Sequence, residues 1–184
     1  MSGVEGARSH DTLMPSHLKR YQTEGGYHFI TFSCYQRAPL LNNDHARIIF
    51  EEILERVRQS HDFYLFGYVL MPEHVHLLLS EPKQQLLSNT MRVLKGETSK
   101  RLKGDRKQFW QNPLPRLQRP HPPKHVEKLR YIHRNPVQRS LVDKPEDWPW
   151  SSYRHYLTGE PSRVEIESEW TWNKRERTTS QSSR

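Results

Sequence analysis

Disulfide bonds are excluded within this chain, because Cys34 is its only cysteine. Long apolar runs are missing as well, and none approaches the roughly 18 residues of a membrane-spanning helix. The N-terminus lacks the apolar core of a secretory signal. Only 33% of the 184 residues are hydrophobic and 13 are proline, which predicts one small core with irregular ends. We therefore expect a cytoplasmic protein with a single folded domain.

Acidic residues are fewer than basic ones in this chain. The 29 lysines and arginines outnumber the 21 acidic residues, which gives a net charge of +8 and a pI of about 9.7. This balance is typical of proteins that bind polyanions such as nucleic acids. An ordinary basic protein without such a partner has the same composition, so the position of the charges matters more than their number.

The order of the expected elements is that of a small α+β domain. Aromatic and β-branched stretches predict strands, and apolar residues at helical spacing predict helices. The strands are expected over 27–35, 63–70 and 74–80, and the helices over about 44–57, 86–102 and 124–135. The short break between the second and third strands implies an antiparallel hairpin. This order predicts a ferredoxin-like α+β fold, an antiparallel sheet with helices packed on one face.

Proline and polar residues mark the irregular segments. Asn112–Pro123 contains five prolines, and we expect an extended, irregular loop there because proline lacks an N–H donor and fixes φ. The helix over 124–135 should end near its last residue, because Pro136 follows it. We expect a flexible arm over 1–20, the folded domain over 21–160 and a polar tail over 161–184. The last fifteen residues of that tail are predicted to be disordered.

The tripeptide His74-Val75-His76 carries the first chemical signal. Side chains alternate along a strand, so both imidazoles point to one face while Val75, Leu77 and Leu79 point into a core. Two histidines on one face can hold a divalent metal ion and leave other coordination positions open. The alternative is a pair of ordinary strand histidines that form hydrogen bonds or face water.

Basic residues gather in the second half of the helix over 86–102 and just beyond it. They precede the aromatic pair Phe109-Trp110, and basic groups near aromatic rings suit the backbone and bases of single-stranded nucleic acid. A solvated helix face is the alternative. The candidate DNA-binding residues, including two from the helix over 124–135, are Arg92, Lys95, Lys100, Arg101, Lys103, Lys128 and Arg134.

Tyr131 and Asn135 are four residues apart and share a helix face. If their helix crosses the open face of the sheet, the Asn135 carbonyl oxygen can be a third metal ligand and Tyr131 points at the same ion. A phenol with a pKa of about 10 is a poor nucleophile, and a nearby cation favours the phenolate. Attack on a polarised phosphate would give a covalent phosphotyrosine bond. A packed helix tyrosine and a C-capping asparagine are the alternatives.

Three segments together, MPEHVHLLL (71–79), YIHRNPV (131–137) and WPWSSYRHY (148–156), resemble the REP-associated tyrosine transposases. These are small bacterial IS200-like transposases of the HUH single-strand nuclease superfamily, and the similarity runs from about residue 21 to 170. The resemblance implies that His74 and His76 bind Mg²⁺ or Mn²⁺, with Asn135 as a further ligand. It also implies that Tyr131 is the nucleophile.

The same resemblance implies a DNA transposase, a metal-dependent endonuclease and strand transferase that acts on single-stranded hairpin DNA of repeated palindromes. Cleavage would leave a 5′-phosphotyrosine and a free 3′-hydroxyl. The protein would work in the cytoplasm, at the nucleoid, as a monomer or a homodimer. Members of the family carry an aromatic, basic stretch where this chain has Asn112–Pro123, so the departure bears on the placement of the nucleophile helix and on DNA contacts.

Two other functions stay open on the residues. One is a hairpin-DNA-binding protein, derived from a transposase, whose active site no longer assembles. The other is a metal-dependent phosphodiesterase that activates water, in which Tyr131 only packs against the sheet.

Overall fold

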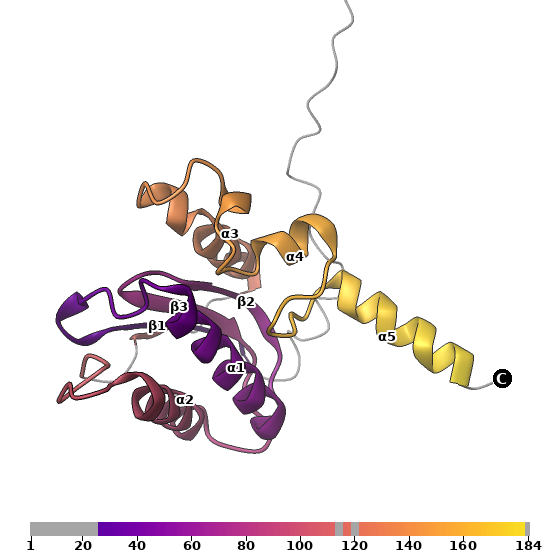
Figure 1. The fold of residues 1–184 in the computed structure, drawn as a ribbon. Helices are drawn as coiled ribbons and strands as arrows, with labels where there is room; N and C mark the ends of the chain where they lie inside the picture. The colour runs from indigo at the N-terminus through magenta and orange to yellow at the C-terminus, as the bar shows by residue number, and fades with distance from the viewer. Residues whose placement is uncertain (1–25, 113–115, 119–121, 183–184) are drawn as a thin grey trace, which may run out of the picture.

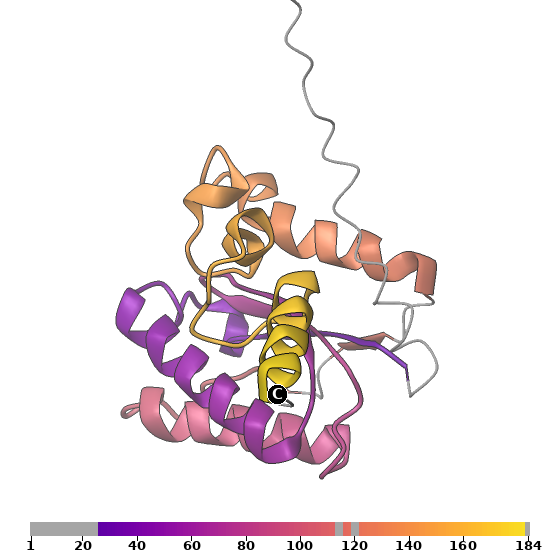
Figure 2. The ribbon, with the colours of Figure 1, turned by 90° about the vertical axis from the view of Figure 1, so that its right-hand side faces the viewer.

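Four strands form one antiparallel sheet in the order β2-β3-β1-β4, the order of a ferredoxin-like fold. The computed structural model describes residues 26–112, 116–118 and 122–182. Its elements are β1 (His28–Ser33), η3 (Tyr35–Arg37), α1 (Asp44–His61), β2 (Leu65–Leu70), β3 (His74–Leu79), α2 (Leu87–Leu102), β4 (Arg116–Gln118), α3 (Pro122–Gln138), η4 (Pro145–Asp147), α4 (Tyr153–Thr158) and α5 (Glu169–Ser182). The predicted α+β fold is confirmed. Helices α1 and α2 lie on one face of the sheet, and α3 crosses the other (Figures 1 and 2).

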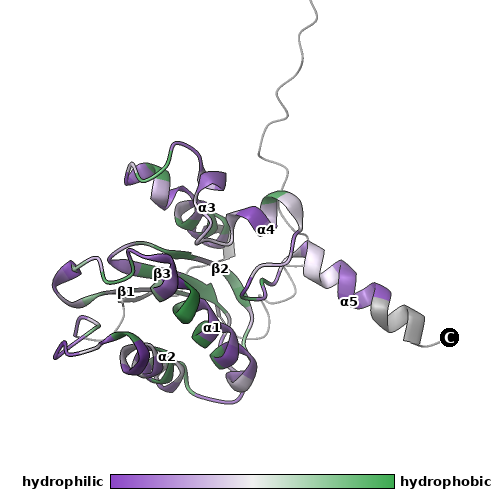
Figure 3. Ribbon diagram, in the orientation of Figure 1, coloured by the Kyte–Doolittle hydropathy of each residue, from purple (hydrophilic) through white to green (hydrophobic). Residues whose placement is uncertain are grey.

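Both faces of the central strands are buried. Ile30 pairs with Leu77 and Phe32 with Val75, and these side chains, at most 4% exposed, belong to the core under α1 and α2. The alternate residues of the same strands lie beneath α3, so every residue of β3 is buried. Figure 3 shows hydrophobic residues along the strands, whereas the described part of α5 is hydrophilic. No helix of the described residues is long and apolar enough to span a membrane.

The outer edge of β2 is covered by the chain that follows α3. Ser151 forms an antiparallel bridge with Val69, and the Leu70 N–H donates to the Trp150 carbonyl at 2.8 Å. The Trp148 indole N–H donates to the Leu70 carbonyl at 3.1 Å. Because an open strand edge invites pairing with other chains, this cover protects the sheet. The WPWSSY segment (148–153) therefore packs along the edge of β2.

Helix α3 comes close to β2 because Gly67 has no side chain there. A Cβ at this position would lie only 2.4 Å from Cδ1 of Leu129. The Ser152 hydroxyl accepts the Tyr68 N–H at 3.1 Å and lies 2.9 Å from Nε2 of His133, so it joins β2 to α3. These contacts set the height of α3 above the sheet.

Gly67→Ala should lower the free energy of unfolding by about 1–3 kcal/mol, because Leu129 must leave its place to admit the new methyl group. Gly96 in α2 is the matched control, since nothing lies within 4 Å of a Cβ there. Gly96→Ala should raise the same free energy by about 0.5–1 kcal/mol, because alanine is the better helix former. Urea denaturation measures both. A Gly67→Ala protein as stable as wild type would contradict the close approach of α3.

The predicted end of α3 is wrong, because the helix runs past Asn135 and through Pro136 to Gln138. Pro136 has no N–H to donate to the carbonyl four residues before it, so the helix loses one hydrogen bond there. The carbonyls of Asn135 and Pro136 nevertheless accept N–H groups from residues that follow. Arg139 donates to Asn135 and Leu141 to Pro136, each at 3.0 Å. Packing in the last turn, where Asn135 is buried, outweighs the local preference of a residue before proline for extended geometry.

The prediction of an irregular loop over Asn112–Pro123 is wrong in part. Residues 116–118 contain no proline and pair with β1 as the short edge strand β4. Pro122 and Pro123 begin α3, where the missing N–H groups need no helical partner. Residues 113–115 and 119–121 lie outside the described part of the chain, as does the predicted arm over 1–20. Helix α3, which begins at Pro122, still packs against the sheet.

The predicted polar tail is folded over most of its length. Val164 and Ile166 are buried, and the Glu167 N–H donates to the carbonyl of Leu65 in β2 at 2.8 Å. Helix α5 then occupies the region predicted to be disordered and extends away from the sheet in Figure 1.

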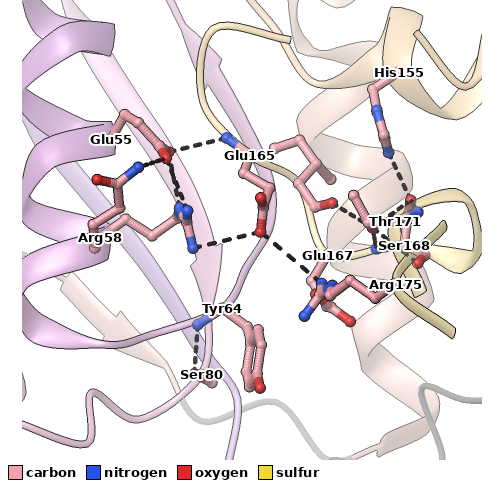
Figure 4. Close-up of polar contacts among 12 residues, drawn as sticks. Glu55, Arg58, Tyr64, Ser80, His155, Glu165, Glu167, Ser168, Thr171 and Arg175 are labelled. Carbon is pink, nitrogen blue, oxygen red and sulfur yellow. Dashed lines mark hydrogen bonds and ion pairs between the residues drawn. The ribbon is translucent and has the colours of Figure 1, made fainter. Parts of the chain in front are cut away.

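Polar contacts hold this C-terminal segment against α1 (Figure 4). Arg58 pairs with Glu55 at 2.8 Å and with Glu165 at 3.7 Å, and the Glu165 N–H donates to Glu55 at 3.0 Å. Glu167 pairs with Arg175 of α5. Glu165 lies far in the sequence from Glu55 and Arg58, so the composition of the tail did not reveal these contacts.

Candidate active site

The residues predicted as nucleophile and ligands line one pocket of about 380 Å³ between the sheet and α3. β3 supplies His74 and His76, and α3 supplies Tyr131 and Asn135. The described residues that line it are Phe29, Thr31, Arg37, His74, His76, Lys128, Tyr131, Asn135, Gln138 and Arg139. The tertiary structure therefore brings all four together.

The two imidazole rings meet edge to face, with their Nε2 atoms 3.0 Å apart. Nδ1 of His74 lies 2.9 Å from the Glu73 carboxylate, and Nδ1 of His76 lies 2.7 Å from the Thr31 hydroxyl. The carboxylate only accepts, so it holds the tautomer in which Nδ1 donates and Nε2 keeps its lone pair. The Thr31 hydroxyl can accept from Nδ1 of His76 in the same way, and this tautomer would leave the Nε2 lone pairs of both histidines available to a shared cation.

Asn135 brings its side-chain amide to the same place. Its Nδ2 lies 3.4 Å from Nε2 of His76, whereas its Oδ1 is buried with no hydrogen-bond partner among the described residues. A buried carbonyl oxygen without a partner is costly, and an amide oxygen suits Mg²⁺ or Mn²⁺. The described residues contain no group of three or more His, Cys, Asp or Glu that could hold a metal. Two imidazoles and this amide nevertheless fit one divalent ion.

Burial keeps both histidines neutral. It lowers the pKa of His76 to about 3, with further lowering by His74, Lys128 and Arg37. Burial lowers the pKa of His74 as well, against the opposing effect of the Glu73 carboxylate. Neutral imidazoles at physiological pH have the lone pairs that metal binding requires.

Tyr131 lies at the mouth of the pocket and is 41% exposed. Its ring meets Phe29 and His76 edge to face, at centroid distances of 6.0 and 5.2 Å. Phe29 in turn stacks on His76 at 5.4 Å. These aromatic contacts orient the phenol ring and leave part of the residue open to a substrate.

The pocket is cationic. Arg37, Lys128 and Arg139 line it, and no carboxylate occurs among its described lining residues. Arg139 pairs with Glu73 at 3.0 Å, and Nζ of Lys128 lies 4.9 Å from the centre of the Phe29 ring. Such a pocket favours an anionic ligand.

The seven predicted DNA-binding residues are not gathered at the pocket. Lys128 lines it, whereas Arg134 lines a separate cavity of about 650 Å³ on another side of α3. The five others belong to α2 and its C-cap, on the opposite face of the sheet (Figure 1). Arg101 there pairs with Glu52 at 3.2 Å. Contact of all seven with DNA stays a prediction.

Four pocket or supporting residues were missed from the sequence. Glu73 had a signal, because it precedes His74 and carboxylates commonly orient metal-binding histidines. Arg139 lies one helical turn after Asn135. It was missed because the helix was expected to end near Asn135. Thr31 becomes visible only through its pairing with the second histidine across β1 and β3, and Arg37 only through the turn after β1.

Glu73→Gln should weaken Mn²⁺ binding by about 10–100-fold, because a neutral amide holds His74 less firmly in the required tautomer. Titration of the DNA-free protein, followed by electron paramagnetic resonance of Mn²⁺, measures this. Glu97→Gln removes a partly exposed carboxylate that pairs with Arg56, and it should leave the affinity unchanged. Equal affinities for the Glu73 variant and wild type would exclude this supporting role.

Comparisons with known proteins indicate the family of this chain. The family model described as "Transposase IS200 like" matches residues 21–114. The REP-associated tyrosine transposase of Escherichia coli K12 is 27% identical over 142 residues, which cover 75% of this chain and 82% of that protein. A candidate REP-associated tyrosine transposase of Haemophilus influenzae Rd is 23% identical over 163 residues, with 79% and 89% covered.

A solved structure has a similar fold. It is that of a REP-associated tyrosine transposase bound to a REP hairpin, with a TM-score of 0.62 and 24% sequence identity. The similarity covers 78% of this chain and 87% of that one.

Proposed function

Because this chain belongs to the family of IS200-like transposases, we propose that it cuts and rejoins single-stranded DNA through Tyr131. The resemblance to REP-associated tyrosine transposases, drawn from three motifs, is confirmed by the relatives that the chain matches. We further propose that His74, His76 and Asn135 hold Mg²⁺ or Mn²⁺ beside the tyrosine.

One observation carries the proposal. A partly exposed tyrosine shares a cationic pocket with two imidazoles and with the side-chain amide of Asn135, whose buried oxygen has no hydrogen-bond partner among the described residues. A packed tyrosine alone would require neither the oxygen nor the cations. A phosphodiester complements both, since its negative charge suits the lysine and arginines and its phosphorus is the electrophile for a phenol oxygen.

In the proposed cleavage step, one bond to phosphorus forms as another breaks. Oη of Tyr131 loses its proton and bonds to phosphorus, and the bond from phosphorus to the 3′-oxygen breaks. The departing oxygen takes up a proton and becomes a 3′-hydroxyl, while the 5′-phosphate stays on the tyrosine. When bound, a divalent cation would polarise the phosphate and favour the phenolate. Attack by a 3′-hydroxyl reverses the step and rejoins DNA, so the energy of the bond is conserved.

The neighbouring side chains support this step. Phe29 and His76 hold the phenol ring edge to face, so its oxygen meets the phosphate in a restricted orientation. Lys128 lies three residues before Tyr131 on the same helix face, and its positive charge favours binding of the phosphate.

We propose hairpin DNA with single-stranded flanks as the substrate. Support comes from the net charge of +8 and from the similar transposase whose structure contains a REP hairpin. Lys128 then contacts the phosphate that is cut, and the basic residues of α2 are candidates for contacts with more distant DNA.

The test uses a pool of hairpins with randomised stems and flanks, labelled at either the 5′ or the 3′ end, with Mn²⁺ or with EDTA. On a denaturing gel, the 3′-labelled fragment should travel with the protein only when Mn²⁺ is present, and the 5′-labelled fragment should be released. Binding with no covalent product in Mn²⁺ would support the DNA-binding alternative. Cleavage that leaves both fragments free of protein would support a phosphodiesterase that uses water.

A further inference from the structure

Arg37 reaches the active-site pocket from an unusual turn. It closes η3, directly after β1, and both Gln36 and Arg37 have left-handed backbones, with φ of 52° and 54°. Residues other than glycine and asparagine rarely adopt this conformation, and strained backbones of this kind cluster at functional sites. The sequence therefore maintains an unfavourable turn that carries an arginine to the pocket.

Several hydrogen bonds hold this turn in place. The Gln36 N–H donates to Oε1 of Gln111 at 2.9 Å, and the Arg37 N–H donates to the carbonyl of Cys34 at 3.0 Å. The Cys34 N–H donates to the carbonyl of Glu73 at 2.8 Å, directly before the first of the two histidines. The turn and the histidine strand are thus built as one unit, and the position of Arg37 is tied to that of the pocket floor.

The three cations of the pocket differ in what they contact. Arg139 is neutralised by Glu73, and Lys128 lies over the Phe29 ring. Arg37 forms no ion pair with any side chain in the described part of the chain. The described lining of the pocket contains no carboxylate that could neutralise it. Among the described residues, Arg37 therefore has no carboxylate partner and is available to an anionic ligand.

Arg37 is also near the reacting centre. It lines the same pocket as both histidines and Tyr131.

We propose that Arg37 is a catalytic residue, whose guanidinium donates hydrogen bonds to a non-bridging oxygen of the phosphodiester that Tyr131 attacks. This inference rests on the proposed function. As the phenol oxygen bonds to phosphorus and the 3′-oxygen departs, negative charge builds up on the non-bridging oxygens. A guanidinium that is already in place stabilises this charge more in the transition state than in the bound substrate, and it keeps its own protons throughout.

The first test compares Arg37→Asn, Arg37→Lys and a control, Arg56→Asn. Asparagine tolerates the left-handed backbone, so the melting temperature of Arg37→Asn should match or exceed that of wild type. Its single-turnover rate of adduct formation should fall by about 10²–10³-fold, the usual cost of one transition-state donor. Lysine should restore part of the rate. Arg56 is exposed on α1 and pairs with Glu97, so its loss removes the same charge without an effect on the rate.

The second test separates catalysis from general DNA affinity. Affinity is measured by fluorescence anisotropy with Tyr131→Phe as the background, and it should change far less than the rate. Replacing each non-bridging oxygen of the scissile phosphate by sulfur should slow wild type unequally for the two diastereomers, in Mn²⁺. Arg37→Asn should reduce that inequality, because the contact that discriminates between the oxygens is gone.

The outcomes are distinct. No adduct with wild type would overturn this inference together with the proposed function. An adduct with wild type, but an Arg37→Asn rate equal to that of the Arg56 control, would overturn the role of Arg37 alone. Parallel losses of rate and affinity, with the sulfur inequality unchanged, would place Arg37 in general DNA binding and also overturn its catalytic role.

Discussion

Tyr131→Phe should abolish the covalent protein–DNA adduct while hairpin binding persists. Phenylalanine keeps the ring that meets Phe29 and His76 edge to face, so packing at the mouth of the pocket is retained. It lacks the oxygen that bonds to phosphorus, so no covalent intermediate can form. The denaturing gel with 3′-labelled hairpins measures the adduct, and fluorescence anisotropy measures binding.

A matched control for this variant is Tyr153→Phe. Tyr153 lines the cavity on another side of α3 and is not among the residues of the active-site pocket. Its hydroxyl should therefore be dispensable for the adduct. An adduct formed by Tyr131→Phe would show that another residue is the nucleophile. Metal-dependent cleavage by this variant without an adduct would show that water attacks and that Tyr131 only packs.

His76→Ala should remove Mn²⁺ binding and adduct formation together. The variant loses one of the two Nε2 atoms, which lie 3.0 Å apart, and it leaves the Thr31 hydroxyl without its His76 partner. The loss of affinity should exceed the roughly 10–100-fold that the loss of an outer partner such as Glu73 costs. Calorimetric titration of the DNA-free protein with Mn²⁺ measures the affinity, and a thermal melt checks that the variant folds.

Two further variants make this test specific. His45 is an exposed histidine on α1, and His45→Ala should leave Mn²⁺ binding unchanged. Asn135→Ala should weaken the affinity, because the buried Oδ1 is lost, whereas Asn135→Asp should retain it by keeping an oxygen at the same position. Unchanged Mn²⁺ affinity in both His76→Ala and Asn135→Ala would refute the proposed ligand set.

Local periodicity accounts for the parts of the site that could be predicted. His74 and His76 share a face because strand side chains alternate, and Tyr131 and Asn135 share one because they are a helical turn apart. The three long strands and the helices on one face of the sheet were predictable for the same reason. Local rules also misled, since Pro136 implied a helix end that tertiary packing overrides, and a polar composition implied a disordered tail where α5 forms.

The sequence by itself determined which chemical groups are present and how neighbours are oriented along each element. Only the tertiary structure decided that the histidine strand and the tyrosine helix meet, that Thr31 supports His76 across 45 positions, and that Arg37 enters the pocket. The physical reason is that backbone geometry fixes the relative orientation only of residues a few positions apart in the sequence. Contacts between distant segments depend instead on sheet register, on the space left by Gly67, and on the packing of α3 over the sheet.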